Sequence, residues 1–167
     1  MGKTIENLGE AFAGESKANR TYLAFAKKAD DEGHKQVARL FRAAAAAETV
    51  HALNHLKEMG GIGSTIDNLK KAVVGEHYEF QSMYPKFIKE AESEGAKGAR
   101  WSFDVANKVE KIHHSLYSAA LKALETNQKV SETDYYVCQC CGNTVEGQPP
   151  EKCPICGAPK SKFTKVQ

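Results

Sequence analysis

The first 137 residues of this 167-residue chain contain no cysteine, and all five cysteines fall between Cys138 and Cys156. A disulfide framework of the kind that holds small secreted domains together is therefore excluded for most of the chain. The odd number and close spacing of the cysteines instead favour a metal site in this segment.

Long apolar runs and an excess of one charge are also missing. The run of small side chains from Ala43 to Ala47 is far short of the roughly 20 apolar residues of a membrane span, and the first residues contain no apolar signal segment. The 23 basic and 21 acidic residues are mixed along the chain and give a net charge of +2. This charge provides no field for nucleic acid or an anionic membrane, so we expect a soluble, cytoplasmic protein with neither partner.

Proline is scarce in the first 130 residues, where Pro85 alone interrupts a stretch rich in Ala, Glu, Lys and Leu. These residues favour helices, and glycines near residues 33, 60 and 95 punctuate the stretch. The pattern predicts four long helices, at about residues 4–31, 34–59, 65–94 and 98–127. Ser64 and Asp67 have the spacing of a capping box, and Pro85 predicts a kink or bulge inside the third helix.

A polar linker over residues 128–134 separates this part from a segment of different composition. From Tyr135 on, glycine and proline become frequent and the helical period stops. We therefore expect two domains, a helical one over residues 1–130 and a loop-built module over residues 135–167.

The helical part contains an internal repeat. Tyr22 to His51 align without a gap with Tyr84 to His113, with 11 identities in 30 positions. Each copy ends in Glu-x-x-His, which places a carboxylate and an imidazole on one helix face. Chance placement of 16 glutamates and 6 histidines gives roughly 0.6 such pairs, so two pairs in register exceed chance.

Further glutamates stand at a similar phase before each repeat. Glu15 precedes Tyr22 by seven residues, whereas Glu76 and Glu79 precede Tyr84 by eight and five. The set approaches a di-iron carboxylate site, in which two helices give one Glu each and two give Glu-x-x-His, with one extra carboxylate. The alternative is a set of glutamates on solvated faces. The candidate ligands are Glu15, Glu48, His51, Glu76, Glu79, Glu110 and His113.

Carboxylates with one imidazole per metal suit iron in both oxidation states and leave positions open for an oxidant. We interpret Tyr22 and Tyr84, which match across the repeat, as donors to the ligand carboxylates rather than as plain core aromatics. His55 is left as a core or supporting residue. Three other histidines lie off the ligand stripe or at helix ends and are not expected to bind metal: His34, His77 and His114.

The C-terminal cysteines form two metal knuckles. Cys138 and Cys141 make the first and Cys153 and Cys156 the second, each followed by glycine, with 11 residues between them. Four thiolates at this spacing predict a tetrahedral site that accepts iron or zinc. Zinc would make the module a structural ribbon and iron a one-electron relay, and Cys140 is expected to be a loop thiol.

In this order, the chain contains AFAGES around Glu15, the Glu48/His51 pair, GEHYE followed by MYP, the Glu110/His113 pair and the cysteine tail. This combination resembles the rubrerythrin family over essentially the whole chain. The resemblance implies a ferritin-like four-helix di-iron bundle fused to a rubredoxin domain. It also implies reduction of hydrogen peroxide, with electrons from NAD(P)H delivered through a reductase or a rubredoxin.

For individual residues, the resemblance implies that Glu48 and Glu110 bridge the irons. It further implies that Glu15 holds one iron, whereas Glu76 and His113 hold the other.

The resemblance also implies that the first iron exchanges Glu79 for His51 on reduction, so that both residues take part in catalysis. Cys140 is the departure from the family pattern. Two other functions compete with peroxide reduction. One is a ferritin-like ferroxidase or storage protein, and the other is a simple metal-binding or electron-carrier protein.

The expected assembly follows from one short connection. In a ferritin-like bundle the second and third helices run parallel, so their connection must span a helix of about 25 residues, or about 37 Å. The segment from Gly60 to Ser64 reaches at most about 20 Å. We therefore expect a domain-swapped homodimer, or a larger oligomer, in which each bundle takes two helices from each chain. The alternative is an up-down-up-down bundle with a different metal geometry.

Overall fold

The structure is a computed structural model that describes residues 2–167. Its helices are α1 (Lys3–Asp31), α2 (Lys35–Glu58), α3 (Thr65–Tyr78), the π-helical turn η1 (Glu79–Met83), α4 (Tyr84–Ser93) and α5 (Lys97–Glu125). Its strands are β1 (Tyr135–Cys138), β2 (Thr144–Glu146) and β3 (Phe163–Lys165), with the short 3-10 turn η2 (Lys160–Lys162) before β3. The prediction of a mainly helical fold with a small C-terminal knuckle module is confirmed. Within residues 2–167, no helix combines the length and apolar character that crossing a membrane requires.

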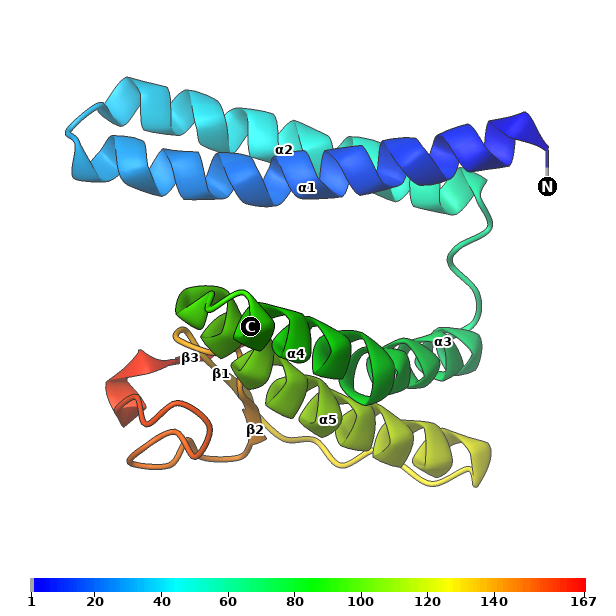
Figure 1. The fold of residues 1–167 in the computed structure, drawn as a ribbon. Coiled ribbons are helices and arrows are strands. Elements are labelled where there is room, and N and C mark those ends of the chain that lie inside the picture. Colours follow the sequence, from blue (N-terminus) through cyan, green and yellow to red (C-terminus); the bar gives the residue numbers. More distant parts are fainter. Residues whose placement is uncertain (1) are drawn as a thin grey trace. The chain divides into compact units, whose positions relative to one another are not determined.

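The chain divides after Gly63 into two compact units. The first is a hairpin of α1 and α2, which lie against each other along their length (Figure 1). Alanines fill the contact and allow close approach of the two backbones: Ala26, Ala29, Ala38, Ala45 and Ala52. The buried amide of Asn19 ties the helices together, because it donates to the Ala45 carbonyl at 2.6 Å and to the Thr49 hydroxyl at 2.8 Å.

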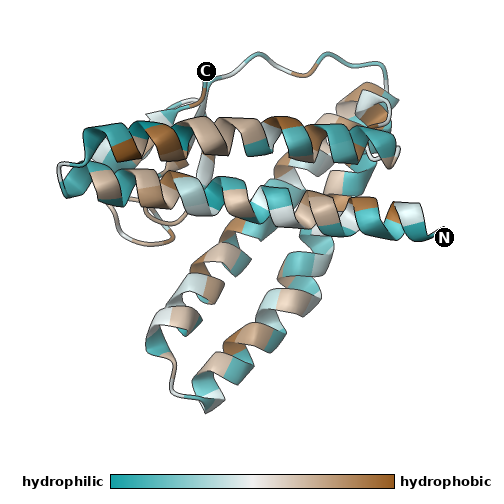
Figure 2. Cartoon of the chain, turned by 90° about the horizontal axis from the view of Figure 1, so that it is seen from above, coloured by the Kyte–Doolittle hydropathy of each residue, from teal (hydrophilic) through white to brown (hydrophobic). Residues whose placement is uncertain are grey.

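Large apolar side chains remain exposed on this hairpin. Leu40 is 68% exposed, and similar positions include Leu23, Phe25, Val50 and Leu53. Figure 2 shows apolar and polar segments alternating along both helices. The alanine seam thus buries only the small side chains, and much of the larger apolar surface of the hairpin stays free for further packing.

The second unit begins with an interrupted helix, α3–η1–α4, which packs against α5. The predicted capping box is present, since the Asp67 N–H donates to Ser64 Oγ at 3.2 Å and the Ser64 N–H donates to Asp67 Oδ2 at 3.3 Å. The predicted irregularity is also present. Pro85 stands in the first turn of α4, directly after η1.

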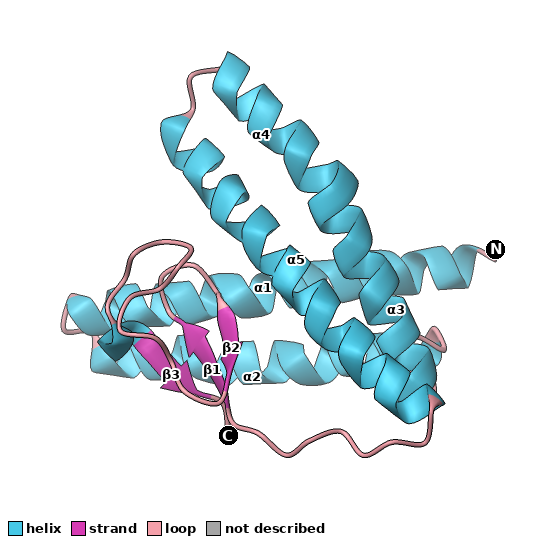
Figure 3. Ribbon diagram, turned by 90° about the horizontal axis from the view of Figure 1, so that it is seen from below, coloured by secondary structure: helices cyan, strands magenta, loops and turns pink. Residues whose placement is uncertain are grey.

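The C-terminal module contains a three-stranded antiparallel sheet in the order β2-β1-β3 (Figure 3). Gly142 and Gly157 follow the two knuckles with φ of 82° and 76°, a conformation that L side chains rarely adopt. The first knuckle lies on α5, because a Cβ on Gly142 would stand 3.9 Å from a methyl group of Val109. The module therefore packs against α5 within the second unit.

Candidate metal centres

The first unit brings together one candidate ligand group from α1 and α2. Glu15, Glu48 and His51 each offer an atom within 4.8 Å of the others. Glu48 and His51 are three residues apart on α2, and Glu48 Oε2 lies 2.9 Å from His51 Nδ1. The His51 side chain is 53% exposed, whereas that of Glu48 is 18% exposed.

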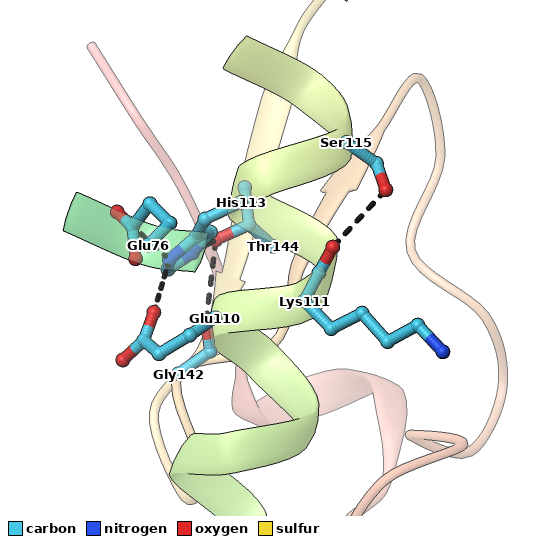
Figure 4. Close-up of polar contacts among 7 residues, drawn as sticks. All are labelled: Glu76, Glu110, Lys111, His113, Ser115, Gly142 and Thr144. Carbon is cyan, nitrogen blue, oxygen red and sulfur yellow. Dashed lines mark hydrogen bonds and ion pairs between the residues drawn. The ribbon is translucent and has the colours of Figure 1, made fainter. Parts of the chain in front are cut away.

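The second unit repeats this arrangement on α3 and α5. Glu76, Glu110 and His113 form a group within the same 4.8 Å limit, and they turn toward one another in Figure 4. His113 Nδ1 lies 2.7 Å from Glu110 Oε2 and 3.9 Å from Glu76 Oε1. The His113 side chain is 27% exposed, so this imidazole is more enclosed than that of His51.

The π-helical turn explains the unequal spacing of the carboxylates. Glu76 precedes Tyr84 by eight residues, whereas Glu15 precedes Tyr22 by seven. A π turn accommodates one extra residue, so it returns Glu76 to the phase that Glu15 has on the regular helix α1. Glu79, the first residue of the turn, lies outside the group of three.

In the second group, burial and neighbouring carboxylates raise the pKa values of the acidic side chains. Burial, followed by the charge of Glu110, raises the pKa of Glu76 to about 7. Burial and Glu110 also raise the pKa of Glu79, and the hydrogen bond to Glu110 raises the pKa of His113. Several carboxylates lie close together in this group, and their mutual repulsion disfavours the charged forms. A bound cation would relieve this repulsion. The donors present therefore fit iron, which binds carboxylate and imidazole together.

The two repeat-matched tyrosines sit in equivalent aromatic clusters. Tyr22 stacks near Phe25 and Phe41 with ring centroids 6.4 and 6.1 Å away, and Tyr84 lies 6.3 Å from both Phe87 and Phe103. These phenylalanines are identities of the repeat that the sequence reasoning did not single out. Burial, Glu110, Glu79 and Glu76 raise the pKa of Tyr84, so its ring lies within reach of the ligand charges. A role of either hydroxyl as a donor to the carboxylates stays a prediction.

The four knuckle cysteines converge in the C-terminal module. Their sulfurs form one group, with Cys138 and Cys156 at 3.8 Å and Cys141 and Cys153 at 3.6 Å. Sulfurs about 2.3 Å from a central ion at the corners of a tetrahedron are about 3.8 Å apart. The geometry therefore fits a thiolate-bound metal. Cys140 is exposed and lies outside the group, in agreement with its expected place as a loop thiol.

The knuckle thiols differ in their tendency to ionise. Burial raises the pKa of Cys141. Burial acts in the same direction on Cys153, but the backbone N–H groups of Cys156 and Ile155 lower the pKa of Cys153 to about 7. These N–H groups favour a thiolate at Cys153, which is the form that binds a metal.

Two residues after the first knuckle were missed by the sequence reasoning. Asn143, which is 1% exposed, directs its Nδ2 to Cys153 Sγ at 3.6 Å. The next residue, Thr144, places its hydroxyl 2.9 Å from His113 Nε2. The sequence carried no signal for this contact, because it joins residues 31 positions apart in two segments of different composition.

The remaining histidines lie outside the ligand groups. His77 and His114 make edge-to-face contacts with Phe80, with ring centroids 5.2 and 5.4 Å away, and His34 stands at the start of α2. None of these, nor His55, joins a ligand group within residues 2–167.

Comparisons with known proteins match both parts of the chain. The family model described as Rubrerythrin matches residues 6–121, and that described as Rubrerythrin, rubredoxin-like domain matches residues 136–164. Nigerythrin of Nitratidesulfovibrio vulgaris is 39% identical over 98% of this chain and 87% of its own length. Rubrerythrin-2 of Clostridium acetobutylicum is 37% identical over 96% of this chain and 95% of its own. A structure of fully reduced, all-ferrous nigerythrin covers 99% of this chain and 88% of its own, with a TM-score of 0.59 and 36% identity.

Proposed function

Because the chain belongs to the rubrerythrin family, with a di-iron site and a rubredoxin-like four-cysteine site, we propose that it reduces hydrogen peroxide to water. The observation that carries this proposal is the presence, in one chain, of two matched Glu/Glu/His groups and a four-thiolate centre. An iron-storage protein would gain nothing from the thiolate centre, and a simple electron carrier would not need the two carboxylate groups.

The reaction requires two electrons and two protons for each peroxide, whose O–O bond breaks to give two waters. When bound, iron held by the two Glu/Glu/His groups and by the four cysteines would supply the electrons for this reaction. In our proposal Glu48 of the first group and Glu110 of the second would each help to hold the two irons, a role that follows from the family resemblance. Glu15 then serves one metal, and Glu76 with His113 the other.

We propose that His51 and Glu79 are the ligands that change position during the reaction. Within a single chain, the His51 side chain is 53% exposed and that of His113 is 27% exposed. Glu79 stands on the π-helical turn, outside the group of three, where a carboxylate could exchange with His51 at the same metal. Burial and the charge of Glu110 raise the pKa of Glu79, and we propose this carboxyl as the group that passes a proton to the departing oxygen.

We also propose that each complete site draws on two chains. The connection between α2 and α3, from Met59 to Ser64, has six residues and reaches about 21 Å, whereas α2 with its 24 residues is about 36 Å long. In a domain-swapped dimer α1 and α2 of one chain would join α3 to α5 of another. The exposed apolar side chains of both units, such as Leu40 and Val74, support such packing.

The electron donor in this proposal is a rubredoxin or an NAD(P)H-dependent reductase that reduces the four-cysteine iron. Five cysteines without a disulfide suit the reducing cytoplasm, which we propose as the location.

A stopped-flow comparison tests the proposed function. Iron-loaded protein should contain about three irons per chain, and its reduced form should be oxidised by hydrogen peroxide at least about tenfold faster than by oxygen. Faster oxidation by oxygen would instead support a ferroxidase. Cys153→Ser is the matched control, because it should lose the iron of the four-cysteine site and steady turnover while keeping the single-turnover reaction with peroxide.

A further inference from the structure

Both ring nitrogens of His113 are engaged by neighbours. Nδ1 lies 2.7 Å from Glu110 Oε2, and Nε2 lies 2.9 Å from the hydroxyl oxygen of Thr144. That oxygen also lies 3.2 Å from the carbonyl oxygen of Gly142. Figure 4 shows the resulting chain from the ligand group through the imidazole to the backbone of the first knuckle.

The donor and acceptor roles along this chain follow from the groups themselves. The Gly142 carbonyl can only accept, and the Thr144 hydroxyl has a single hydrogen to donate to it. The hydroxyl oxygen is then free to accept a hydrogen bond from Nε2–H of His113. With the proton on Nε2, the Nδ1 lone pair points into the group of Glu76 and Glu110. This is the tautomer that a metal ligand at Nδ1 requires.

The same short segment also contacts the thiolate centre. Asn143 and Thr144 are consecutive residues, and Thr144 is the first residue of β2. The Asn143 amide reaches Cys153 Sγ at 3.6 Å, whereas Thr144 reaches His113. Two neighbouring residues therefore touch one ligand of each candidate centre.

The other half of the repeat has no counterpart to this support. Among the contacts described for residues 2–167, the His51 ring has one hydrogen bond, to Glu48. A histidine ligand whose second nitrogen is held keeps its orientation and tautomer, and loss of such an outer partner weakens metal binding about 10- to 100-fold.

We propose that Thr144 is a positioning residue of the di-iron site. Its hydroxyl holds His113 with Nδ1 facing the metal and links that ligand to the strand that follows the first cysteine knuckle. This role rests on the ligand set of the proposed function but is independent of which oxidant the irons reduce.

The test uses full-length, iron-loaded protein and the variant Thr144→Val, which keeps the shape and strand preference of the side chain but removes the hydroxyl. The measurements are retention of bundle iron against a ferrous chelator and the Mössbauer spectrum of the diferric site. We expect bundle iron to be held about tenfold or more weakly and one of the two iron signals to change, with the visible absorption of the four-cysteine iron intact. Thr144→Ser should restore both. Thr164→Val, in the same sheet at an exposed position, is the control and should leave both unchanged.

Bundle-iron affinity and both iron signals of Thr144→Val equal to those of the unmodified protein would overturn the proposal, as would a Thr144→Ser variant as weak as the valine variant. If valine disturbs the absorption of the four-cysteine iron, Thr144→Ala and Thr144→Ser are compared in its place. Equal affinity in these two variants also overturns the proposal. Reduced protein that reacts faster with oxygen than with peroxide would sink the proposed function without changing this result.

Discussion

The two halves of the repeat share an aromatic cluster and a Glu-x-x-His pair, but the contacts of their histidines differ. Both have an aromatic cluster at matching positions, with the pairs Phe25–Phe41 and Phe87–Phe103 each at 5.5 Å. Both end in a Glu-x-x-His pair with the carboxylate within hydrogen-bonding distance of the imidazole. Within residues 2–167, the π-helical turn and a hydrogen bond to the cysteine module are described for the second half.

The two halves of the repeat differ in the surroundings of their histidines and in the carboxylates near them. His113 is enclosed and held from both sides of its ring, whereas His51 is half exposed and held from one side. In the second half a further carboxylate, Glu79, becomes available at the π turn. The two halves supply similar candidate ligands, and they differ in the π-helical turn and in the hydrogen bonds of their histidines.

The largest loss of bundle iron is expected when either half of the repeat loses its Glu-x-x-His pair. A Glu48→Ala/His51→Ala chain and a Glu110→Ala/His113→Ala chain should each lose both bundle irons and keep the iron of the four-cysteine site. Unfolded and refolded together, the two chains should regain about a quarter of the normal bundle sites, because half of the dimers are mixed and one of their two sites is intact. Iron analysis of the refolded mixture measures this, and purified mixed dimers should hold about half of the normal bundle sites. No recovery there would disprove the exchange of hairpins.

The matched single variants separate the two histidines. His113→Ala should reduce bundle iron to half or less, because it removes a fixed ligand. His51→Ala should keep its iron in the diferric state but slow the oxidation of the reduced protein by peroxide about tenfold or more. Iron content and stopped-flow rates provide the comparison. If both variants lost iron and rate equally, the distinction between a fixed and a moving histidine would be wrong.

The π turn can be removed while its helix is kept. Deletion of Ser82, an exposed residue of η1, should turn the segment before it by about 100° and carry Glu76 away from Glu110 and His113. We expect weaker binding of the iron at this half, seen as partial iron loss at low metal concentration. Ser82→Ala keeps the residue count and should bind normally. Full iron retention after the deletion would show that the turn does not set the position of Glu76.

The smallest expected effect is on the pH dependence of the metal-free protein. The pKa of Glu76 is raised from 4.5 to about 7, so its stabilising contribution is complete below pH 4.5 and is lost as the pH rises through about 7. His113, whose pKa is raised above 6.5, acts in the same direction. The unfolding midpoint should therefore fall by a few degrees between pH 5 and pH 8. Glu76→Gln should flatten this dependence in circular dichroism melts, and an unchanged slope would contradict it.

Much of the fold could be predicted from the sequence because its signals are local. Helix formers, the capping box at Ser64 and Asp67, the irregularity at Pro85 and the two cysteine knuckles each depend on residues close in the chain. The repeat also placed Glu48 with His51 and Glu110 with His113, and both pairs are close in the structure.

What escaped prediction depends on contacts between distant segments. The hydrogen bond between His113 and Thr144 exists because the module packs on α5, and no periodicity or motif encodes that packing. The burial of Asn143 beside Cys153 has the same origin. The extra residue at η1 does have a signal in the sequence. Glu76 precedes Tyr84 by eight residues, whereas Glu15 precedes Tyr22 by seven.

The π-helical turn also records an order of events in the ancestry of the chain. The two copies align without a gap from their tyrosines onward, and the extra residue lies just before the second tyrosine. The simplest history is a duplication of an ancestral helical hairpin, followed by insertion of one codon into the second copy. Because a helix absorbs a single added residue in one wide turn, the insertion left the later helix contacts in register. One added residue thus gives the second half a π-helical turn that carries the acidic side chain of Glu79, and the helix contacts that follow keep the register of the first half.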